Sequence, residues 1–198
     1  DAENYNSTLL RSVEVDTTLP VPVFANPTTN ATNLSQSFIQ ANVSVTETNL
    51  DTINISLFNS TQNIINSSFS ESNNLFINFT GLTDGTYYLN ASVNDTAGNR
   101  NYTETRIITL DATFPTITIN LPSNNTFTTD TLQDINFTVV NSNLNTCWYG
   151  NDTYTANITL ANCNTNITTL NWAEGQHNVT VYVNDTSNNV NSSRVTFT

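Results

Sequence analysis

Residues 93–99, VNDTAGN, decide the fold, because a close copy of them returns 90 residues later as residues 183–189, VNDTSNN. Further pairs occur in the same order along the chain: 16–20 (DTTLP) with 111–115 (DATFP), 49–52 (NLDT) with 143–146 (NLNT), and 84–85 (DG) with 174–175 (EG). Ordered matches with a slowly drifting offset indicate two copies of one unit that differ by small loop insertions.

Each copy is predicted to be all β. Alternation of apolar and polar residues, the mark of strands with one buried face, runs through residues 41–45, 53–57, 135–139 and 179–183. No stretch keeps a helical period, and Asn and Thr are poor helix formers. About 90 residues with roughly seven strands is typical of an immunoglobulin-like sandwich. We therefore predict two tandem immunoglobulin-like β-sandwich domains, 16–110 and 111–198, plus an extra N-terminal strand in residues 1–15.

The turn segments carry a family resemblance. Residues 81–88, GLTDGTYY, look like the start of strand F in fibronectin type III and bacterial immunoglobulin-like domains. Residues 94–99, NDTAGN, resemble a turn of tandem immunoglobulin-like repeats in prokaryotic surface proteins, from which the second copy departs with SNN in place of AGN. Cys147-Trp148-Tyr149, with a second Cys downstream, is similar to such repeats in archaeal surface proteins. The resemblance implies architecture and an archaeal cell surface, but it implies very little about biochemical activity, because a sandwich hosts many functions.

Residues 1–15 belong to neither copy. They align with the end of the first copy, Ala2 on Ala97 and Arg11 on Arg106, and so look like the final strand of a domain. Three interpretations stay open: a window from a longer repeat array, a strand that completes a sheet in a neighbouring subunit of a head-to-tail fibre, or an extra edge strand on the first domain. An apolar strand left unpaired is an aggregation hazard, so we expect it to pair somewhere. The opening residues do not resemble a signal sequence, which indicates a mature chain or a fragment.

The composition excludes several function classes. The chain has 36 Asn and 36 Thr, no Lys and four Arg, with a formal net charge of −12 and a pI near 4.1. Four Arg cannot supply the basic footprint that nucleic acid requires. Without Lys, neither a phosphate-binding lysine loop nor a Schiff base is available. Apolar residues make up 37%, which is enough for a core, and no apolar run of about 18 residues is present to span a membrane.

Acceptor motifs for N-glycosylation, Asn-x-Ser/Thr, are abundant. There are nineteen, at Asn6, Asn30, Asn33, Asn42, Asn54, Asn59, Asn66, Asn78, Asn90, Asn94, Asn101, Asn124, Asn136, Asn151, Asn157, Asn166, Asn178, Asn184 and Asn191. The alternative is an Asn- and Thr-rich solvent face with incidental motifs. We favour dense N-glycosylation, because the motifs fall on outward strand positions where a sugar costs no packing. This modification indicates the outside of an archaeal or eukaryotic cell.

Five residues of the second copy are candidates for a bridge or a site. Cys147 and Cys163 are expected to form a disulfide, since a metal or redox pair favours Cys-x-x-Cys or a neighbouring His. His177, the only histidine, takes the place of Tyr87 at the start of strand F and is interpreted as a packing residue rather than a catalytic base. Trp148 and Trp172 are candidates for a sugar-stacking platform or for covers on the core edge.

Acidic residues are expected to meet where each copy begins. The turn that carries Asp95 should approach Asp16, with Glu47 and Asp51 close by, and Asp185 should approach Asp111, Asn143 and Asn145. Oxygen ligands at loose geometry suit Ca²⁺, and the resemblance to tandem adhesin repeats implies calcium at such linkers. The alternative is that Asp95 and Asp185 hydrogen-bond the backbone of their own turns.

The sequence as a whole favours a non-enzymatic structural protein. We expect an extracellular glycoprotein that forms part of a filament, pilus-like thread or surface layer, with copies of itself or adjacent repeats as partners and N-linked glycans but no required cofactor. The alternative is an adhesin whose domain-end loops bind a carbohydrate or a protein. An enzyme is weakly supported, because the chain has no lysine, no Cys–His pair and no nucleophile elbow.

Overall fold

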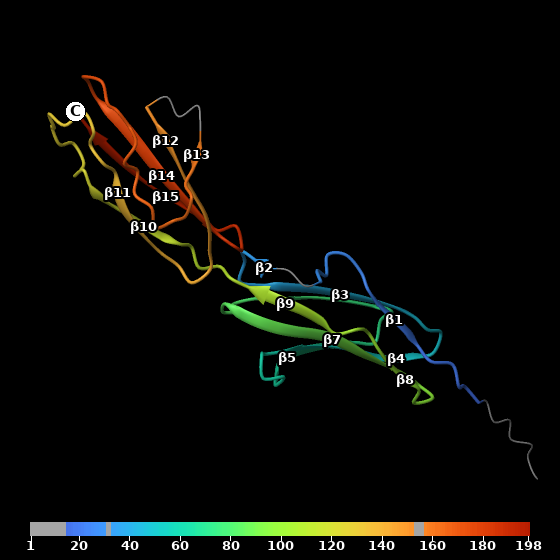
Figure 1. Ribbon diagram of the computed structural model, residues 1–198. Helices are drawn as coiled ribbons and strands as arrows, with labels where there is room; N and C mark the ends of the chain where they lie inside the picture. Colours follow the sequence, from blue (N-terminus) through green and yellow to red (C-terminus); the bar gives the residue numbers. More distant parts are fainter. Residues whose placement is uncertain (1–14, 31–32, 153–156) are drawn as a thin grey trace, which may run out of the picture. The chain divides into compact units, whose positions relative to one another are not determined.

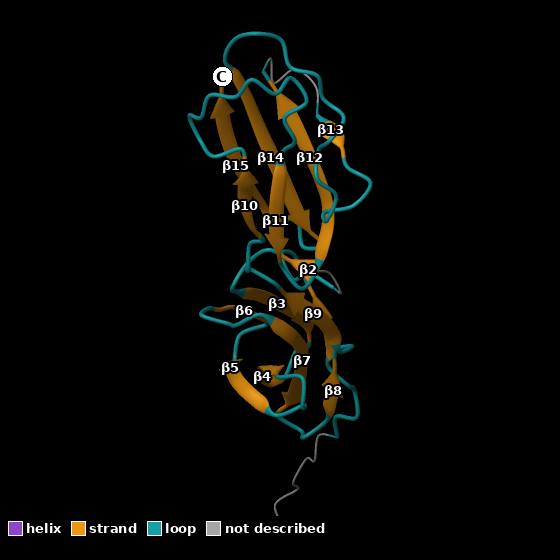
Figure 2. Ribbon diagram, turned by 60° about the vertical axis from the view of Figure 1, so that its left-hand side comes forward, coloured by secondary structure: helices purple, strands orange, loops and turns teal. Residues whose placement is uncertain are grey.

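The computed structural model describes residues 15–30, 33–152 and 157–198. These residues form β-strands joined by turns and loops, and no helix occurs among them (Figure 2). The predicted all-β class is therefore confirmed. The described residues also hold no helix long and apolar enough to cross a membrane.

Contacts between residues group the chain into two compact units. The first comprises the described residues of Asp1–Thr29, Gln40–Phe79 and Tyr88–Arg106, and the second comprises those of Asn30–Ile39, Thr80–Tyr87 and Ile107–Thr198. The domain boundaries expected from the sequence, 16–110 and 111–198, stay a prediction. Below, residues 16–110 are called the first repeat and residues 111–198 the second repeat, whereas the two groups defined by contacts are called compact units.

The first repeat contains two sheets. The three-stranded sheet has the order β1-β3-β6 and the six-stranded sheet has the order β2-β9-β7-β4-β5, with β8 pairing β7. The pairs β1–β3, β4–β5, β4–β7 and β7–β8 are antiparallel, and the pair β2–β9 is parallel. This is the strand order of an immunoglobulin-like sandwich. The strands are β1 (Val21–Phe24), β2 (Asn33–Leu34), β3 (Ile39–Thr46), β4 (Leu50–Phe58), β5 (Ile64–Ser70), β6 (Asn74–Phe79), β7 (Gly85–Asp95), β8 (Arg100–Tyr102) and β9 (Arg106–Leu110).

The second repeat contains a two-stranded and a four-stranded sheet. The first pairs β10 with β11, and the second has the order β13-β12-β14-β15, in which β14 runs between β12 and β15 (Figure 1). The strands are β10 (Thr116–Leu121), β11 (Asn136–Val140), β12 (Leu144–Asn151), β13 (Ile158–Thr159), β14 (His177–Asp185) and β15 (Val190–Phe197).

The alternating pattern in the sequence places one face of each strand in the core. Along β7, every second residue from Tyr87 to Asp95 is buried, and the residues between them are half-buried. The same alternation holds in β3, where Ile39 and Val43 are fully buried. Burying these side chains supplies the main driving force for folding, at about 25 cal/mol per Å² of apolar surface. The four stretches in which the sequence predicted alternation lie in or directly beside β3, β4, β11 and β14.

The smaller sheet differs between the repeats. In the first repeat β6 adds a third strand beside β3, whereas in the described residues of the second repeat only the bridge between Ile135 and Ile167 occupies that edge. Beside this bridge, the Asn166 side-chain oxygen accepts the Phe137 N–H at 3.2 Å. Three residues earlier, Cys163 is joined to Cys147 on β12 of the other sheet.

The core of the second repeat is a single cluster that includes both cysteines and an aromatic group. Trp172 packs against Phe197, with ring centroids 5.0 Å apart and an edge-to-face geometry, and against His177 at 4.9 Å. Offset and edge-to-face aromatic pairs add about 0.5–1.5 kcal/mol beyond their buried area. Trp172 and His177 are both buried, so the packing interpretation of these two residues agrees with the structure.

Candidate functional site

A polar cluster, which we call the Asp–Asn clasp, is formed in the first repeat by Asp16, Asn49, Asp95 and Asn99. Asp95 lies at the end of β7 and accepts, through Oδ1, the backbone N–H groups of Ala97 (3.0 Å) and Asn99 (2.8 Å). Asn99 Nδ2 donates to Asp95 Oδ2 (2.7 Å) and to the carbonyl oxygen of Asp16 (3.1 Å). Asn49 Nδ2 donates to Asp16 Oδ2 (3.1 Å). The clasp therefore fixes the turn after β7 to the segment that leads into the repeat.

The second repeat reproduces this clasp with Asp111, Asn143, Asp185 and Asn189. Asn189 Nδ2 donates to Asp185 Oδ2 and to the Asp111 carbonyl, both at 2.8 Å, and Asn143 Nδ2 donates to Asp111 Oδ2 at 3.0 Å. Ser187, in place of Ala97, adds a donor to the same Asp111 oxygen at 3.2 Å. Asp185 and Asn189 are fully or almost fully buried. The same bonds in both copies indicate a structural element of the repeat rather than a site unique to one copy.

The left-handed residue of the turn explains one difference between the sequences. The third residue after the Asp has a positive φ in both repeats, 89° at Gly98 and 63° at Asn188. Gly adopts this conformation without strain, and Asn is one of the few other residues that tolerate it. The change from AGN to SNN therefore preserves the turn.

The candidate calcium ligands are placed by the same geometry. Asp16 and Asp95 are brought together through Asn99, as Asp111 and Asp185 are through Asn189. Glu47 instead accepts the backbone N–H groups of Thr48 and Asn49. The remaining candidates, Asp51 and Asn145, are exposed on β4 and β12.

These side chains do not fit a calcium site well. Both oxygens of Asp95 and of Asp185 already face N–H donors, whereas a calcium ion requires six to eight oxygens that point inward. Among the described residues, no group of three or more His, Cys, Asp or Glu could hold a metal ion. Calcium binding at the linkers stays a prediction, and nothing below depends on it.

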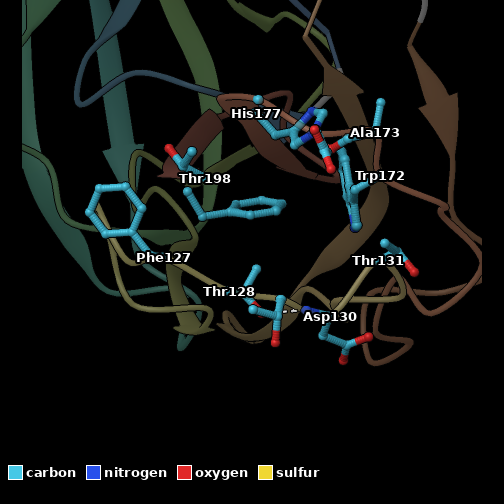
Figure 3. Close-up of a pocket in the computed structure, with 12 residues that line it drawn as sticks. Phe127, Thr128, Asp130, Thr131, Trp172, Ala173, His177 and Thr198 are labelled. Carbon is cyan, nitrogen blue, oxygen red and sulfur yellow. Dashed lines mark hydrogen bonds between the residues drawn. The ribbon is translucent and has the colours of Figure 1, made fainter.

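The far end of the second repeat has a pocket of about 520 Å³, which we call the end pocket. Figure 3 shows Phe127 on one side of it and Trp172 with His177 on the other. Phe127 is 86% exposed, whereas Trp172 is buried and donates its Nε1–H to the Gln133 carbonyl at 2.9 Å. The pocket is lined by Phe127, Thr128, Thr129, Asp130, Thr131, Trp172, Ala173, Glu174, Gly175, His177, Phe197 and Thr198.

His177 is held by partners on both ring nitrogens. Nε2 lies 2.8 Å from the Ala173 carbonyl oxygen, and Nδ1 lies 2.9 Å from Asp152 Oδ2. Burial by itself lowers the pKa of His177, because it disfavours the charged ring, but the Ala173 carbonyl and the Asp152 carboxylate favour the protonated form more strongly. The pKa of His177 is therefore raised above its usual value near 6.5. A histidine that is satisfied on both sides is a packing and anchoring residue.

The other residues singled out from the sequence lie apart from this pocket. The Cys147 and Cys163 sulfurs are 2.07 Å apart and form a disulfide. Trp148 is half-buried on β12 and stacks on Tyr182, with ring centroids 5.5 Å apart. None of the acceptor asparagines that the structure describes is buried; Asn6 lies outside the described residues.

Two functional features escaped the sequence interpretation. Asn99 and Asn189 are the residues that join turn to linker, and their recurrence four positions after Asp95 and Asp185 was the available signal. Asp84 was noted only as a turn residue, yet its carboxylate accepts the backbone N–H of Ala112 at 2.8 Å and the hydroxyl of Thr113. Those two donors, the Thr113 hydroxyl first, hold the pKa of Asp84 below its usual 3.8.

Comparison with known proteins gives distant likenesses in structure only. No family model and no curated sequence matches the chain. The solved structures include fibronectin(III)-like modules of CbhA from Clostridium thermocellum, with a TM-score of 0.43, 16% identity, and coverage of 89% of this chain and 93% of that one. They also include a 1.5-MDa bacterial ice-binding adhesin, with a TM-score of 0.40, 11% identity, and coverage of 91% and 64%, so the chain spans less than two thirds of that structure. Chicken CNTN1 FN1–FN3 domains match with a TM-score of 0.35 and 8% identity over 86% of this chain and 66% of that one.

Proposed function

We propose that the chain is a non-enzymatic structural module of an extracellular, N-glycosylated surface filament, thread or surface layer, whose repeats join head to tail. The observation that carries the proposal is the Asp–Asn clasp, which recurs bond for bond in both repeats. Each clasp engages its carboxylates in hydrogen bonds to the turn and linker, so it holds chain geometry and presents no reactive group. A chain of such repeats transmits force through fixed linkers.

The surface of the chain supports the same proposal. The described acceptor asparagines are all exposed or half-exposed, so a glycan on them does not require the core to open. The disulfide in the second repeat suits an oxidising compartment outside the cytosol. Together with the resemblance to archaeal surface repeats, these features favour the archaeal cell surface as the home of the protein.

A second candidate function is an adhesin module. It is favoured by one observation, the strongly exposed Phe127 beside the end pocket, because an exposed aromatic ring is a platform for a sugar or a peptide. Trp172 weakens this candidate, since the ring is buried between neighbours and offers no free face. Binding of the chain to immobilised glycans, lost in Phe127→Ser, would favour the adhesin.

Immunogold labelling of unpermeabilised cells of the source organism, together with mass mapping of the native protein, tests the main proposal. Antibodies against this chain are expected to label extended structures outside the cell. Peptides that contain the acceptor asparagines are expected to be heavier than the bare sequence until the glycans are removed. Label confined to the cell interior and peptides of unmodified mass would contradict the proposal.

A further inference from the structure

The loop before β7 and the loop before β14 are built in the same way. Leu82 N–H donates to the Ser37 carbonyl, and Trp172 N–H donates to the Thr131 carbonyl, both at 2.9 Å. The Tyr87 hydroxyl donates to the carbonyl of Thr83, and His177 Nε2 lies against the carbonyl of Ala173, each four residues back and each at 2.8 Å. Glu174 therefore occupies in the second repeat the place that Asp84 occupies in the first.

Asp84 binds the linker between the two repeats. Within the second compact unit, the Asp84 carboxylate accepts the Ala112 N–H and the Thr113 hydroxyl, which belong to the segment that opens the second repeat. In the same unit, the Ser35 hydroxyl donates to the amide oxygen of Asn189 in the turn of the clasp. Asp84 thus binds the linker, and Ser35 binds the clasp of the second repeat. We call Asp84 and Ser35 the receiving residues.

The corresponding surface of the second repeat is exposed. Glu174 is exposed, and it lies at the end pocket with Phe127. The backbone N–H of Thr198 donates to Thr126 at 2.9 Å, as that of Asp111 donates to Leu34, so Phe127 follows Thr126 at the position that Ser35 takes after Leu34. Glu174 and Phe127, the counterparts of Asp84 and Ser35, are therefore both exposed.

The first repeat begins with a segment that corresponds to the linker bound by Asp84, and this segment is exposed. Thr17 and Thr18, which correspond to Ala112 and Thr113, are both exposed. In the clasp that follows, Asp16 and Asn99 are half-exposed, whereas their counterparts Asp111 and Asn189 are 7% and 1% exposed. The clasp of the second repeat, which lies beside Ser35, is therefore covered, whereas the clasp of the first repeat is half-exposed; we call the latter the open clasp.

We propose that the end pocket binds the first repeat of a second copy of this chain, with Glu174 accepting hydrogen bonds from Thr17 and Thr18 of that copy. The contact joins two different surfaces, so it is heterologous and extends into a chain instead of closing into a dimer. Phe127 supplies the apolar area, which is removed from water when the open clasp covers it. This inference rests on the proposed head-to-tail assembly and assigns its contact.

Sedimentation velocity of the full chain from micromolar to millimolar concentration tests the proposal. The chain is expected to self-associate, with roughly tenfold weaker affinity in Glu174→Gln, because one charge-assisted acceptor is lost. Phe127→Ser is expected to weaken association further. Glu71→Gln is the matched control, since Glu71 is an exposed carboxylate outside this pocket, and it is expected to leave the affinity unchanged.

A second measurement locates the contact and keeps its failure distinct from failure of the proposed function. The NMR signal of the Trp172 indole N–H is expected to shift with protein concentration, while that of Trp148 stays in place. A chain that remains monomeric at all concentrations, or that associates equally in Glu174→Gln and Glu71→Gln, would overturn the proposal. Association abolished only by removing residues 1–14 would also overturn it, in favour of strand addition. Neither result bears on surface labelling or glycan mass, which test the proposed function.

Discussion

Asn189 and Asp111 lie 78 residues apart in the sequence, yet the Asn189 side-chain nitrogen donates to the Asp111 carbonyl oxygen at 2.8 Å. The same nitrogen also donates to Asp185, so one amide group ties the turn after β14 to the linker that opens the repeat. Both hydrogen bonds lie within the second compact unit, where they join the turn to the linker segment.

Asn189→Ala is expected to destabilise the second repeat by about 3 kcal/mol, because it leaves the buried Asp185 carboxylate and the Asp111 carbonyl short of donors. Both tryptophans belong to the second repeat, so tryptophan fluorescence during urea unfolding reports on that repeat alone. Asn99→Ala is the counterpart in the half-exposed clasp, and it is expected to leave the tryptophan transition unchanged. Equal loss in both variants would contradict the account.

Asn188→Val is expected to cost about 1–2 kcal/mol in the second repeat, because a β-branched residue is strained at a φ of 63°. Asn188→Gly restores the residue of the first repeat, and it is expected to be neutral or slightly stabilising. Thermal unfolding followed by tryptophan fluorescence distinguishes the two variants. A turn that accepts Val without loss would show that the left-handed conformation does not persist in solution.

Replacing Cys147 and Cys163 by Ala is expected to lower the stability of the second repeat by about 3 kcal/mol, since the bridge closes a short loop in the unfolded chain. The first repeat lacks cysteine, so amide hydrogen exchange in β3 and β7 is expected to remain as in the wild type. If reduction left the tryptophan transition at the same urea concentration, the bridge would have no structural role.

The stability of the second repeat is expected to fall as the pH rises above about 6.5. A raised pKa in the folded state means that His177 stabilises the fold fully below its unfolded pKa, and that this contribution is lost as the pH passes the folded pKa. His177→Tyr, which places the residue of the first repeat at this position, is expected to flatten the dependence between pH 6 and 8. A wild-type chain with the same urea midpoint across this range would contradict the prediction.

Glycan occupancy is expected to differ among the acceptor asparagines. Asn101 and Asn191 use Nδ2 to donate to the carbonyls of Pro20 and Pro115, both at 2.9 Å, so a sugar on that nitrogen competes with a bond that both repeats retain. Asn66 and Asn166 are exposed and accept backbone N–H groups through Oδ1, which leaves the nitrogen directed away from that contact. Site-by-site mass spectrometry is expected to find lower occupancy at the first pair; the reverse order would count against the folded geometry as the cause.

The sequence was sufficient for the fold class because its signals are local. Alternation in residues such as Val179 and Val181 and the recurring Asp-Gly and Glu-Gly turns are read from neighbours along the chain. The absence of a third strand beside β11 in the described residues could not be predicted, because Ile167 meets Ile135 only when the chain folds. The role of Asn189 was missed for a similar reason, because its partner Asp111 becomes a neighbour only when the repeat folds.

Cryo-electron microscopy of native, unreduced material tests the central claim most directly. The account predicts filaments in which the Thr17–Thr18 segment of one copy lies against Glu174 of the next. It also predicts glycan density on exposed asparagines. Isolated particles of one chain, with the end pocket open and no sugar on any acceptor, would contradict it.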